Sequence, residues 1–389
     1  MNILMVHPHD IYSRKEPWTR RIRCLAKEFV KQGHNVKLAY FPLTAGSSLS
    51  RMSDGYQVIP LPRTCSPLAF FKNALRLKKL AAWADVVHFQ KCHHYSAIPA
   101  CIAAYLNHKP LHYDWDDWEE MIWFESCGRN PQSEFMGFSF RILERFLPLL
   151  ADTVSVASQN LRDLAVRYGV KEKDIYNAPV GADLEELDSN IKGDRIRKKY
   201  GIKCPLVLYI GQLHGAQYTE LFVRSVSIVL HKNPGVVFMI TGEGSMEKVL
   251  KELSVDLGIE DKIIFTGSVD HHEIPEYIAA ADICVATFRD TNVTRSKSPL
   301  KIVEYMAMGK PVVASNVGEV RKMVGGAGIL VEAGNFCLLA EGILKLLQDK
   351  ALRDNLGKFA LRRVRENYVW SKTASALLMA YQKNVADKN

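Results

Sequence analysis

The chain has 389 residues, of which 48% are hydrophobic and 24% are charged. This length exceeds what one hydrophobic core normally supports, and the composition excludes a predominantly disordered protein, so we expect two globular domains. No run of about eighteen apolar residues is present, which argues against a membrane-spanning helix. The eight cysteines lack C-x-x-C spacing, and no basic leader precedes the first apolar run, so reduced thiols and a cytoplasmic protein are expected.

Positive charge is concentrated near the N-terminus. Residues 1–109 contain 16 Lys or Arg and 5 Asp or Glu, a surplus of 11 that exceeds the net charge of +9 for the whole chain. Such a region suggests an anionic partner, namely nucleic acid, an anionic membrane surface or a phosphorylated substrate, with a solvated basic surface as the alternative. No nucleic-acid-binding motif accompanies the charge, so we expect no nucleic acid partner.

Short β-branched runs alternate with longer amphipathic stretches along the chain, a pattern typical of parallel sheets with crossover helices. Residues 17–32 carry apolar side chains at helical spacing and stop at Gly33, which predicts a helix. In the first half we predict strands at residues 2–7, 35–41, 56–59, 85–89, 110–115, 153–156 and 174–176.

Two further helical stretches of the first half are candidates for contact with lipid or for packing in the core. Residues 68–83 combine aromatic and leucine side chains with four Lys or Arg residues. This helix can lie on an anionic membrane, or else pack its apolar face on the domain core. The aromatic side chains of residues 134–150 are expected to pack in the core or between domains rather than to contact lipid.

The alternation of predicted strands and helices is interrupted at residues 177–189, where Pro, Gly and acidic residues are concentrated, as is typical of an interdomain connection. We therefore predict an α/β chain with domains at residues 1–178 and 179–365, and a C-terminal helix at 366–389 that can pack back on the first domain. The second domain is expected to contain strands at residues 205–210, 236–241, 262–266, 283–286, 311–315 and 328–331.

The segment SPLKIVEYMAMGKPVVAS, residues 298–315, carries the clearest functional signal. Ser298 before Pro299 predicts an N-cap residue and the start of a helix. Gly309 predicts the end of that helix, and PVVAS then predicts a buried strand.

Charged residues surround the predicted helix start. Its unpaired amides and positive dipole can bind an anion, and Lys297 and Lys301 add full positive charges. Glu304 can accept hydrogen bonds from vicinal hydroxyls such as those of a ribose. The alternative is an ordinary capped helix in which Lys301 and Glu304 form a solvated ion pair.

With its flanking strands, this segment resembles the signature of family 4 glycosyltransferases of the GT-B fold. Glu304 matches the second of the family's two signature glutamates, which holds the ribose of the donor. The segments LVLYIGQLHGAQYTELFVRSV, VVFMITGEGS and DKIIFTGSVDHHEIPEYIAAADICVAT are also similar to the family and follow in its order. The resemblance covers nearly the whole chain and implies two Rossmann-like domains facing a central cleft.

The resemblance also implies a set of site residues. A nucleotide-sugar donor is expected in the C-terminal domain, with no metal or other cofactor. The catalytic residues expected are Asp116, Lys301 and Glu304. The donor-binding residues expected are Gly211, Gln212, Gly242, Gly267, Val269, Ser296, Lys297, Ser298, Leu300, Lys301 and Glu304.

Several family residues are replaced in this chain. Ser296 stands eight positions before Glu304, where the family has its first signature glutamate. Gln212 and Gln217 stand at the positions of its phosphate-binding Arg and Lys. The nearby cations that can supply the missing charge are Arg295, Lys297 and Lys301.

The first half departs further from the family. Its Gly-Gly loop is replaced by HDIYSRKEPWTRR, in which Arg14, Lys15, Arg20 and Arg21 can meet phosphate or else form a solvated basic loop. Asp116 stands where the family often has a functional histidine. We expect Asp116 to order an acceptor hydroxyl or to accept its proton.

Acidic and histidine clusters of the first half leave other interpretations open. The carboxylates can be a metal-binding D-x-D of the other large glycosyltransferase fold, or a solvated loop; they are Asp114, Asp116, Asp117, Glu119 and Glu120. Five histidines lack metal-ligand spacing and are expected to be polar residues of the acceptor site; they are His7, His9, His88, His93 and His94.

The resemblance implies a retaining transferase that moves a sugar from a nucleotide sugar to an acceptor. The basic first half favours a phosphorylated or lipid-linked acceptor at the cytoplasmic face of a membrane, with peripheral contact to anionic lipid. Two alternatives are a sugar-nucleotide epimerase and a catalytically silent nucleotide-sugar-binding homologue, and the replaced residues favour the second slightly.

Overall fold

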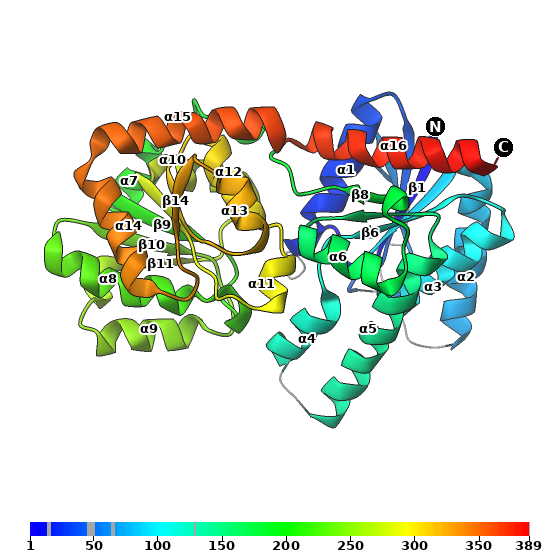
Figure 1. Ribbon diagram of the computed structural model, residues 1–389, viewed down its shortest axis with the longest axis horizontal. Coiled ribbons are helices and arrows are strands. Elements are labelled where there is room, and N and C mark those ends of the chain that lie inside the picture. The colour runs from blue at the N-terminus through cyan, green and yellow to red at the C-terminus, as the bar shows by residue number, and fades with distance from the viewer. Residues whose placement is uncertain (14–16, 45–50, 64–66, 128–129, 389) are drawn as a thin grey trace. The chain divides into compact units, whose positions relative to one another are not determined.

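The computed structural model describes residues 1–13, 17–44, 51–63, 67–127 and 130–388. The chain divides into two compact units, one of residues 1–179 with 370–389 and the other of residues 180–369. Each unit contains a predominantly parallel sheet covered by helices, as Figure 1 shows. The C-terminal helix α16 (Trp370–Lys388) belongs to the first unit.

The sheet of the first unit has eight strands in the order β3-β4-β2-β1-β5-β6-β7-β8. The strands are β1 (Asn2–His7), β2 (Asn35–Tyr40), β3 (Arg51–Ser53), β4 (Tyr56–Pro60), β5 (Val86–Gln90), β6 (Leu111–Trp115), β7 (Thr153–Val156) and β8 (Ile175–Asn177). All pairs are parallel except β3 with β4. The seven predicted strands are confirmed, and the short antiparallel strand β3 was not predicted because its three residues form no apolar run.

Helices cover both faces of this sheet (Figure 1). They are α1 (Arg20–Lys31), α2 (Pro67–Trp83), α3 (His94–Leu106), α4 (Glu119–Cys127), α5 (Pro131–Leu150), α6 (Gln159–Tyr168) and α16. Helices α2, α3, α5 and α6 contribute to one core with Leu4 and Val6 of β1. Helices α1 and α16 pack together, with the rings of Phe29 and Tyr381 5.6 Å apart between centroids.

The sheet of the second unit has six strands in the order β11-β10-β9-β12-β13-β14, all paired in parallel. The strands are β9 (Leu206–Ile210), β10 (Val237–Thr241), β11 (Ile263–Gly267), β12 (Ile283–Ala286), β13 (Val312–Ser315) and β14 (Gly328–Val331), which confirms all six predictions. Alternate side chains of β9 enter two cores: Leu206 and Leu208 join one, and Val207 and Tyr209 join the other.

The helices of the second unit flank these two cores. They are α7 (Asp194–Lys199), α8 (Thr219–Lys232), α9 (Glu247–Asp256), α10 (Ile274–Ala280), α11 (Asn292–Ser296), α12 (Leu300–Ala307), α13 (Gly318–Val324), α14 (Phe336–Gln348) and α15 (Lys350–Asn367). Short 3₁₀ helices are η1 (Pro17–Thr19), η2 (Glu172–Asp174), η3 (Gly215–Gln217), η4 (Glu260–Lys262) and η5 (His271–Glu273). The helix predicted at residues 17–32 is therefore a 3₁₀ turn followed by α1.

The predicted core packing of the aromatic side chains of α5 is only partly correct. Phe140 is buried, but Phe135, Phe138 and Phe146 are 73%, 55% and 52% exposed and do not lie in the core. A helix of 20 residues turns several times, and only the face of α5 that carries Phe140 and Leu147 meets the core. The aromatic content of the segment therefore did not reveal which side chains point outward.

Candidate functional site

Three glycine turns lie at one edge of the second sheet. Gly211, Gly242 and Gly267 lie at the carboxyl ends of β9, β10 and β11, where parallel α/β sheets bind ligands. The amide of Gly211 donates to the carbonyl of Thr241 at 3.0 Å, and the amide of Gly242 donates to that of Gly267 at 2.9 Å. A Cβ atom on Gly242 would lie 1.9 Å from the Gly211 oxygen, so only glycine allows this approach.

The side chain of Lys301 reaches these turns from the first turn of α12. Its Nζ lies 3.0 Å from the hydroxyl of Tyr209 and 3.2 Å from Oε1 of Gln217. A Cβ atom on Gly211 would come within 2.6 Å of the same nitrogen. Burial lowers the pKa of Lys301 to about 7, and Glu304 opposes this only in part. The ammonium thus lies at the glycine turns beside two neutral side chains.

His214 is a neighbour of Lys301 that the sequence analysis missed. Its Nε2 lies 3.3 Å from Nε2 of Gln217. Burial, followed by the charges of Lys297 and Lys301, lowers the pKa of His214 to about 4, so the ring is neutral at pH 7. Both lysines therefore act electrostatically on His214. This histidine could not be identified from the sequence, because it lies in a loop and belongs to no motif.

Glu304 lies one helical turn beyond Lys301 and is only 7% exposed. Within the described ranges, no hydrogen bond or ion pair is made by its carboxylate. Its carboxylate oxygens are not among the fully buried polar atoms without a partner, so they remain accessible to hydroxyl groups of a ligand. The alternative of a solvated Lys301–Glu304 ion pair is wrong, since Lys301 instead contacts Tyr209 and Gln217.

The start of α12 differs from the prediction. Pro299 occupies the N-cap position, with φ −75° and ψ 116°, and the helix begins at Leu300 without a side-chain cap. The hydroxyl of Ser298 instead accepts a hydrogen bond from the amide of Val180 at 3.2 Å. Proline restricts the preceding residue to extended conformations, which keeps Ser298 out of the helix. The predicted helix end is confirmed, with Gly309 at φ 65°.

The replaced signature position is occupied by a buried hydroxyl. Ser296 Oγ donates to the carbonyl of Asn292 at 2.8 Å within α11. Arg295, a candidate to supply charge, is held by both carboxylate oxygens of Asp290 at 2.5 and 2.9 Å. Of the cations considered for the missing charge, Lys301 has contacts at the glycine turns, and Lys297 acts on His214 electrostatically.

Three other predicted donor-binding residues are placed as follows. Gln212 directly follows Gly211 and is half-buried. Val269 packs against the core that contains Leu206 and Leu208. Leu300, the first residue of α12, packs against the same core.

Asp116 lies in the first unit, just beyond β6. Its Oδ2 accepts a hydrogen bond from Nε2 of Gln90 at 2.7 Å, and its Oδ1 lies 3.5 Å from Nζ of Lys91. Burial raises the pKa of Asp116 to about 7, with Lys91 opposing the shift. Protonated and ionised forms are therefore both available near neutral pH, as proton transfer requires.

Lys91 links Asp116 to the rest of the acidic cluster. Its Nζ lies 3.3 Å from Asp117 and 2.5 Å from Glu119. Oxygen atoms of Asp116, Asp117 and Glu119 lie within 4.8 Å of one another and could hold a metal ion. The lysine ammonium already provides these carboxylates with a positive partner, which favours an ion cluster over a metal site.

Asp114 belongs to a different buried network. Arg21 binds it through Nε at 2.7 Å and Nη2 at 2.8 Å, and Ser155 donates to it at 2.5 Å. Burial would raise the pKa of Asp114, but Arg21 holds it below its usual range. Interpreting Arg21 as a loop residue that meets phosphate is therefore wrong, because α1 directs its side chain into the sheet. Arg20 begins α1, and Arg14 and Lys15 lie outside the described residues.

The five histidines lie in three places. His7, His9 and His93 lie near one another, with ring centroids 5.4 Å apart for His7–His9 and 4.8 Å for His9–His93. The assignment of His88 to an acceptor site is wrong, because its ring is fully buried and its Nδ1 lies 2.6 Å from the hydroxyl of Tyr381. His94 begins α3 and is half-buried.

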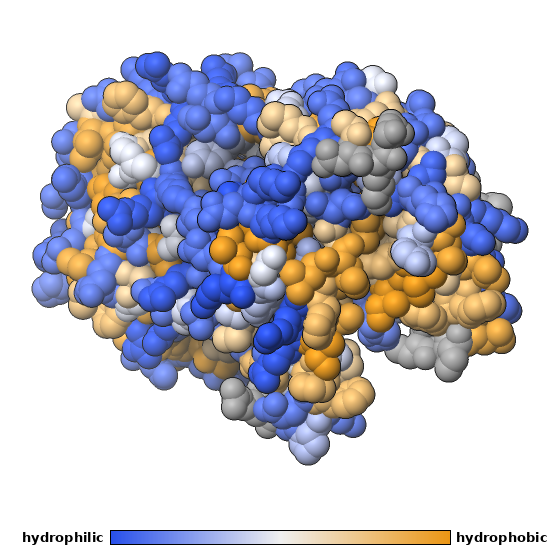
Figure 2. Space-filling model, turned by 45° about the vertical axis from the view of Figure 1, so that its right-hand side comes forward, coloured by the Kyte–Doolittle hydropathy of each residue, from blue (hydrophilic) through white to orange (hydrophobic). Residues whose placement is uncertain are grey.

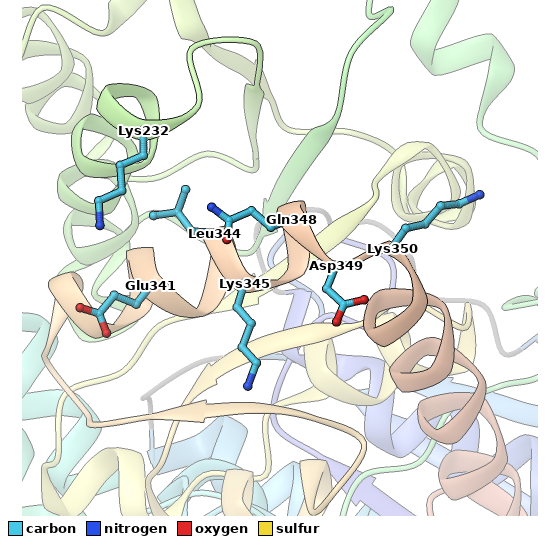
Figure 3. A pocket seen from close by; sticks show the side chains of 7 residues that line it. All are labelled: Lys232, Glu341, Leu344, Lys345, Gln348, Asp349 and Lys350. Carbon is cyan, nitrogen blue, oxygen red and sulfur yellow. The ribbon is translucent and has the colours of Figure 1, made fainter.

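A shallow surface hollow of about 550 Å³ lies elsewhere on the second unit. Figure 3 shows its lining, with Glu341, Lys345 and Gln348 on α14 and Lys232 on α8. Helix α8 begins next to the glycine turns at Thr219 and ends at Lys232, so its 14 residues separate the hollow from those turns. The charged groups of this hollow take no part in the site around Lys301.

Comparisons with known proteins match both halves of the chain. Residues 19–186 match the family model described as Glycosyltransferase Family 4, and residues 204–349 match the model described as Glycosyl transferases group 1. An alpha-D-kanosaminyltransferase of Streptomyces kanamyceticus is 25% identical over 202 residues, 51% of each chain. A D-inositol 3-phosphate glycosyltransferase of Corynebacterium efficiens is 27% identical, covering 65% of this chain and 60% of the relative. The chain thus spans about half to three-fifths of the length of these curated relatives.

Solved structures share the fold over almost the whole chain. Sucrose-phosphate synthase from Thermosynechococcus elongatus has a TM-score of 0.77 at 18% identity and covers 100% of both chains. Anabaena Alr3699/HepE, solved in complex with UDP and glucose, has a TM-score of 0.75 at 17% identity and covers 98% of this chain and 100% of its own. The fold is therefore the two-domain GT-B fold. Among the helices that the structure describes, none has the length and apolarity to cross a membrane.

Proposed function

We propose, from the premise that this chain belongs to the group 1 and family 4 glycosyltransferases, that it transfers a sugar from a nucleotide sugar to an acceptor hydroxyl. The observation that carries the proposal is Glu304, a carboxylate that is 7% exposed and unpaired among the described residues. It lies one turn from a lysine at the glycine turns of β9 and β10. A ribose offers two hydroxyl donors, and the attached diphosphate offers the anion that Lys301 lacks.

In the proposed reaction, the bond between the anomeric carbon and the diphosphate oxygen breaks. A bond from the acceptor oxygen to the same carbon forms, and the acceptor proton passes to the departing phosphate. The negative charge that develops on the diphosphate is stabilised by Lys301 and by the amides at the start of α12. This scheme retains the anomeric configuration and requires no pair of catalytic carboxylates of the glycosidase kind.

The proposed acceptor region lies in the first unit. Asp116, whose pKa is raised to about 7 by burial, would order the acceptor hydroxyl for this transfer, or take its proton in place of the departing phosphate. The neutral side chains of His9 and His93 lie near Lys91 and add polar surface. The acceptor class that we propose is phosphorylated or lipid-linked, since the first 109 residues carry the basic surplus.

Peripheral contact with the cytoplasmic face of a membrane belongs to the same proposal. Helix α2 buries Leu77 in the core, while Phe71 and Leu75 are 61% and 47% exposed. Four Lys or Arg residues and no Asp or Glu lie within Pro67–Trp83. Exposed apolar groups with a uniformly basic set suit an anionic surface.

Donor binding measured by calorimetry tests the proposal, with UDP-sugars first because UDP-glucose binds the structural neighbour Alr3699/HepE. Glu304→Ala should weaken binding by about 1.5–3 kcal/mol, the contribution of charge-assisted hydrogen bonds, while the fold stays intact. Glu341→Ala, at the remote hollow, is the matched control. An unchanged donor affinity in Glu304→Ala would contradict the assignment of Glu304 to the donor site. Donor binding without any sugar transfer or UDP release would identify a silent binding protein instead.

A further inference from the structure

Gln217, in the short helix η3, bridges the side chains of Lys301 and His214. Its Oε1 lies 3.2 Å from Nζ of Lys301, and its Nε2 lies 3.3 Å from Nε2 of His214. Its backbone carbonyl also accepts hydrogen bonds from the hydroxyls of Tyr209 at 3.5 Å and Thr287 at 3.4 Å. Both the main chain and the side chain of Gln217 are therefore held in place.

The chemistry of Lys301 determines which way the Gln217 amide points. An ammonium only donates hydrogen bonds, so the amide atom that faces it is the oxygen. The amide nitrogen then donates to Nε2 of His214, which must be an unprotonated acceptor. Burial, followed by the charges of the nearby lysines, lowers the pKa of His214 to about 4, so the neutral ring supplies that acceptor at pH 7. The hydrogen bonds therefore run in one direction, from Lys301 through Gln217 to His214.

The Lys301 ammonium depends on protein atoms for its hydrogen bonds. Hydrophilic side chains cover much of the molecular face shown in Figure 2, where water can satisfy them. The ammonium of Lys301 is desolvated instead, which lowers its pKa to about 7. Its partners are the Tyr209 hydroxyl and the Gln217 oxygen. Because lysine carries its charge on a flexible four-carbon stem, these contacts determine where the charge lies.

We propose that Gln217 is a positioning residue, whose side-chain oxygen holds the ammonium of Lys301 at the glycine turns while His214 fixes the orientation of the amide. This inference rests on the proposed function, in which Lys301 stabilises the departing diphosphate. A carboxamide suits the role because it accepts a hydrogen bond from the ammonium without neutralising its charge. A carboxylate at this position would compete with the diphosphate for the lysine.

A double-mutant cycle with Lys301→Met tests the proposal through kcat. Gln217→Leu removes the oxygen at nearly constant side-chain size and should lower kcat about tenfold, with a smaller loss of donor affinity. In the Lys301→Met background the same substitution should leave kcat unchanged, because Gln217 acts through the lysine. Gln348→Leu, at the remote hollow on α14, is the matched control and should turn over like the parent. Equal losses in both backgrounds, or parental kcat in Gln217→Leu, would overturn the proposal.

Variants of His214 test the second hydrogen bond. His214→Phe removes the acceptor and should lower kcat about fivefold, the effect of losing one neutral hydrogen bond. His214→Gln should restore turnover, because its amide oxygen can accept from the Gln217 nitrogen in place of Nε2. Equal losses in the two variants would contradict the role of His214 as an acceptor.

A lysine titration tests the contact without any sugar transfer. In NMR spectra of lysine-labelled protein, the Lys301 signal is the one missing from Lys301→Met. It should titrate at lower pH in Gln217→Leu than in the parent, because the lost oxygen no longer stabilises the charged form. The described titratable groups that touch this ammonium or interact with its charge are Glu304, Tyr209 and His214, and all three remain in the variant. An unchanged titration would overturn the proposal. A shifted titration in a protein without transferase activity would support the contact and refute the transferase assignment.

Discussion

The two units hold a buried lysine in opposite ways. Burial alone would lower the pKa of Lys91, but Asp116, Glu119 and Asp117 raise it well above its ordinary value. Lys301 has Tyr209 and Gln217 as neighbours, and burial lowers its pKa to about 7. The same residue type is thus stabilised as a cation in the first unit and destabilised as one in the second.

The difference separates charges that support the fold from charges that are suited to a ligand. In the first unit, Arg21 and Lys91 both lie against carboxylates. In the second unit, the side chains that contact Lys301 are neutral, and Glu304 acts on it only electrostatically. Among the described residues, none makes a hydrogen bond or ion pair with the Glu304 carboxylate. Unmatched buried charge is costly and is concentrated at functional sites. The comparison predicts that substitution of Arg21 or Lys91 reduces the stability of the fold. Substitution of Lys301 or Glu304 is expected to reduce ligand binding and turnover instead.

The largest expected effect is a loss of stability on breaking the buried Arg21–Asp114 ion pair of the first unit. Arg21→Met leaves Asp114 buried without its cation, which should cost about 3–5 kcal/mol of unfolding free energy. Chemical unfolding followed by circular dichroism measures this loss. Arg195→Met, which removes two exposed ion pairs in the second unit, should change the unfolding free energy little. Similar losses in both variants would contradict the distinction between matched buried charge and surface charge.

The next effect concerns turnover at the unmatched lysine. Lys301→Met should lower kcat by about a hundredfold, because the lost charge matters most as the diphosphate departs. Donor affinity should fall less than kcat. The control is Lys310→Met, at the other end of α12, where Nζ donates to the carbonyl of Ala279 at 2.7 Å. A Lys301→Met enzyme with parental kcat would exclude this role.

The depressed pKa of Lys301 also predicts a pH dependence. Its ammonium form binds a diphosphate, so donor affinity should fall as pH rises through about 7, by at most about tenfold per pH unit. Binding at pH 8 should therefore take up a proton. Calorimetry in buffers with different ionisation enthalpies measures that uptake. Lys301→Arg stays protonated throughout this range and should abolish it. Uptake of the same size in Lys301→Arg would assign the proton to another group.

Much of the fold followed from local patterns in the sequence. The strands are short apolar runs, and all thirteen that were predicted are present, because burial on both faces of a parallel sheet requires such runs. Gly309 also ended α12 as predicted, since only a left-handed residue closes the helix there.

Interactions between distant segments could not be predicted in the same way. Arg21 and Asp114 are 93 positions apart, and only the folded structure shows that the side chain of Arg21 on α1 reaches Asp114 on β6. Lys301 meets Gln217 across 84 positions, which explains why the sequence indicated a nearby cation but neither its partners nor His214. Ser298 suited the N-cap position by composition, but its hydroxyl is engaged by Val180.

The smallest effect concerns charges that are neither buried nor paired with a defined ligand. Lys78 and Lys79 lie on the exposed face of α2, and a basic residue near an anionic membrane contributes roughly 1 kcal/mol, about fivefold in affinity. Lys78→Glu/Lys79→Glu should therefore weaken binding to anionic vesicles at low salt, and the difference should shrink as salt shortens the screening length. Lys248→Glu/Lys251→Glu makes the same change in net charge on α9 of the second unit and is the matched control. If both double variants lose the same affinity, overall charge rather than α2 attracts the protein to lipid. If neither loses any, a soluble acceptor becomes the better account of the basic first half.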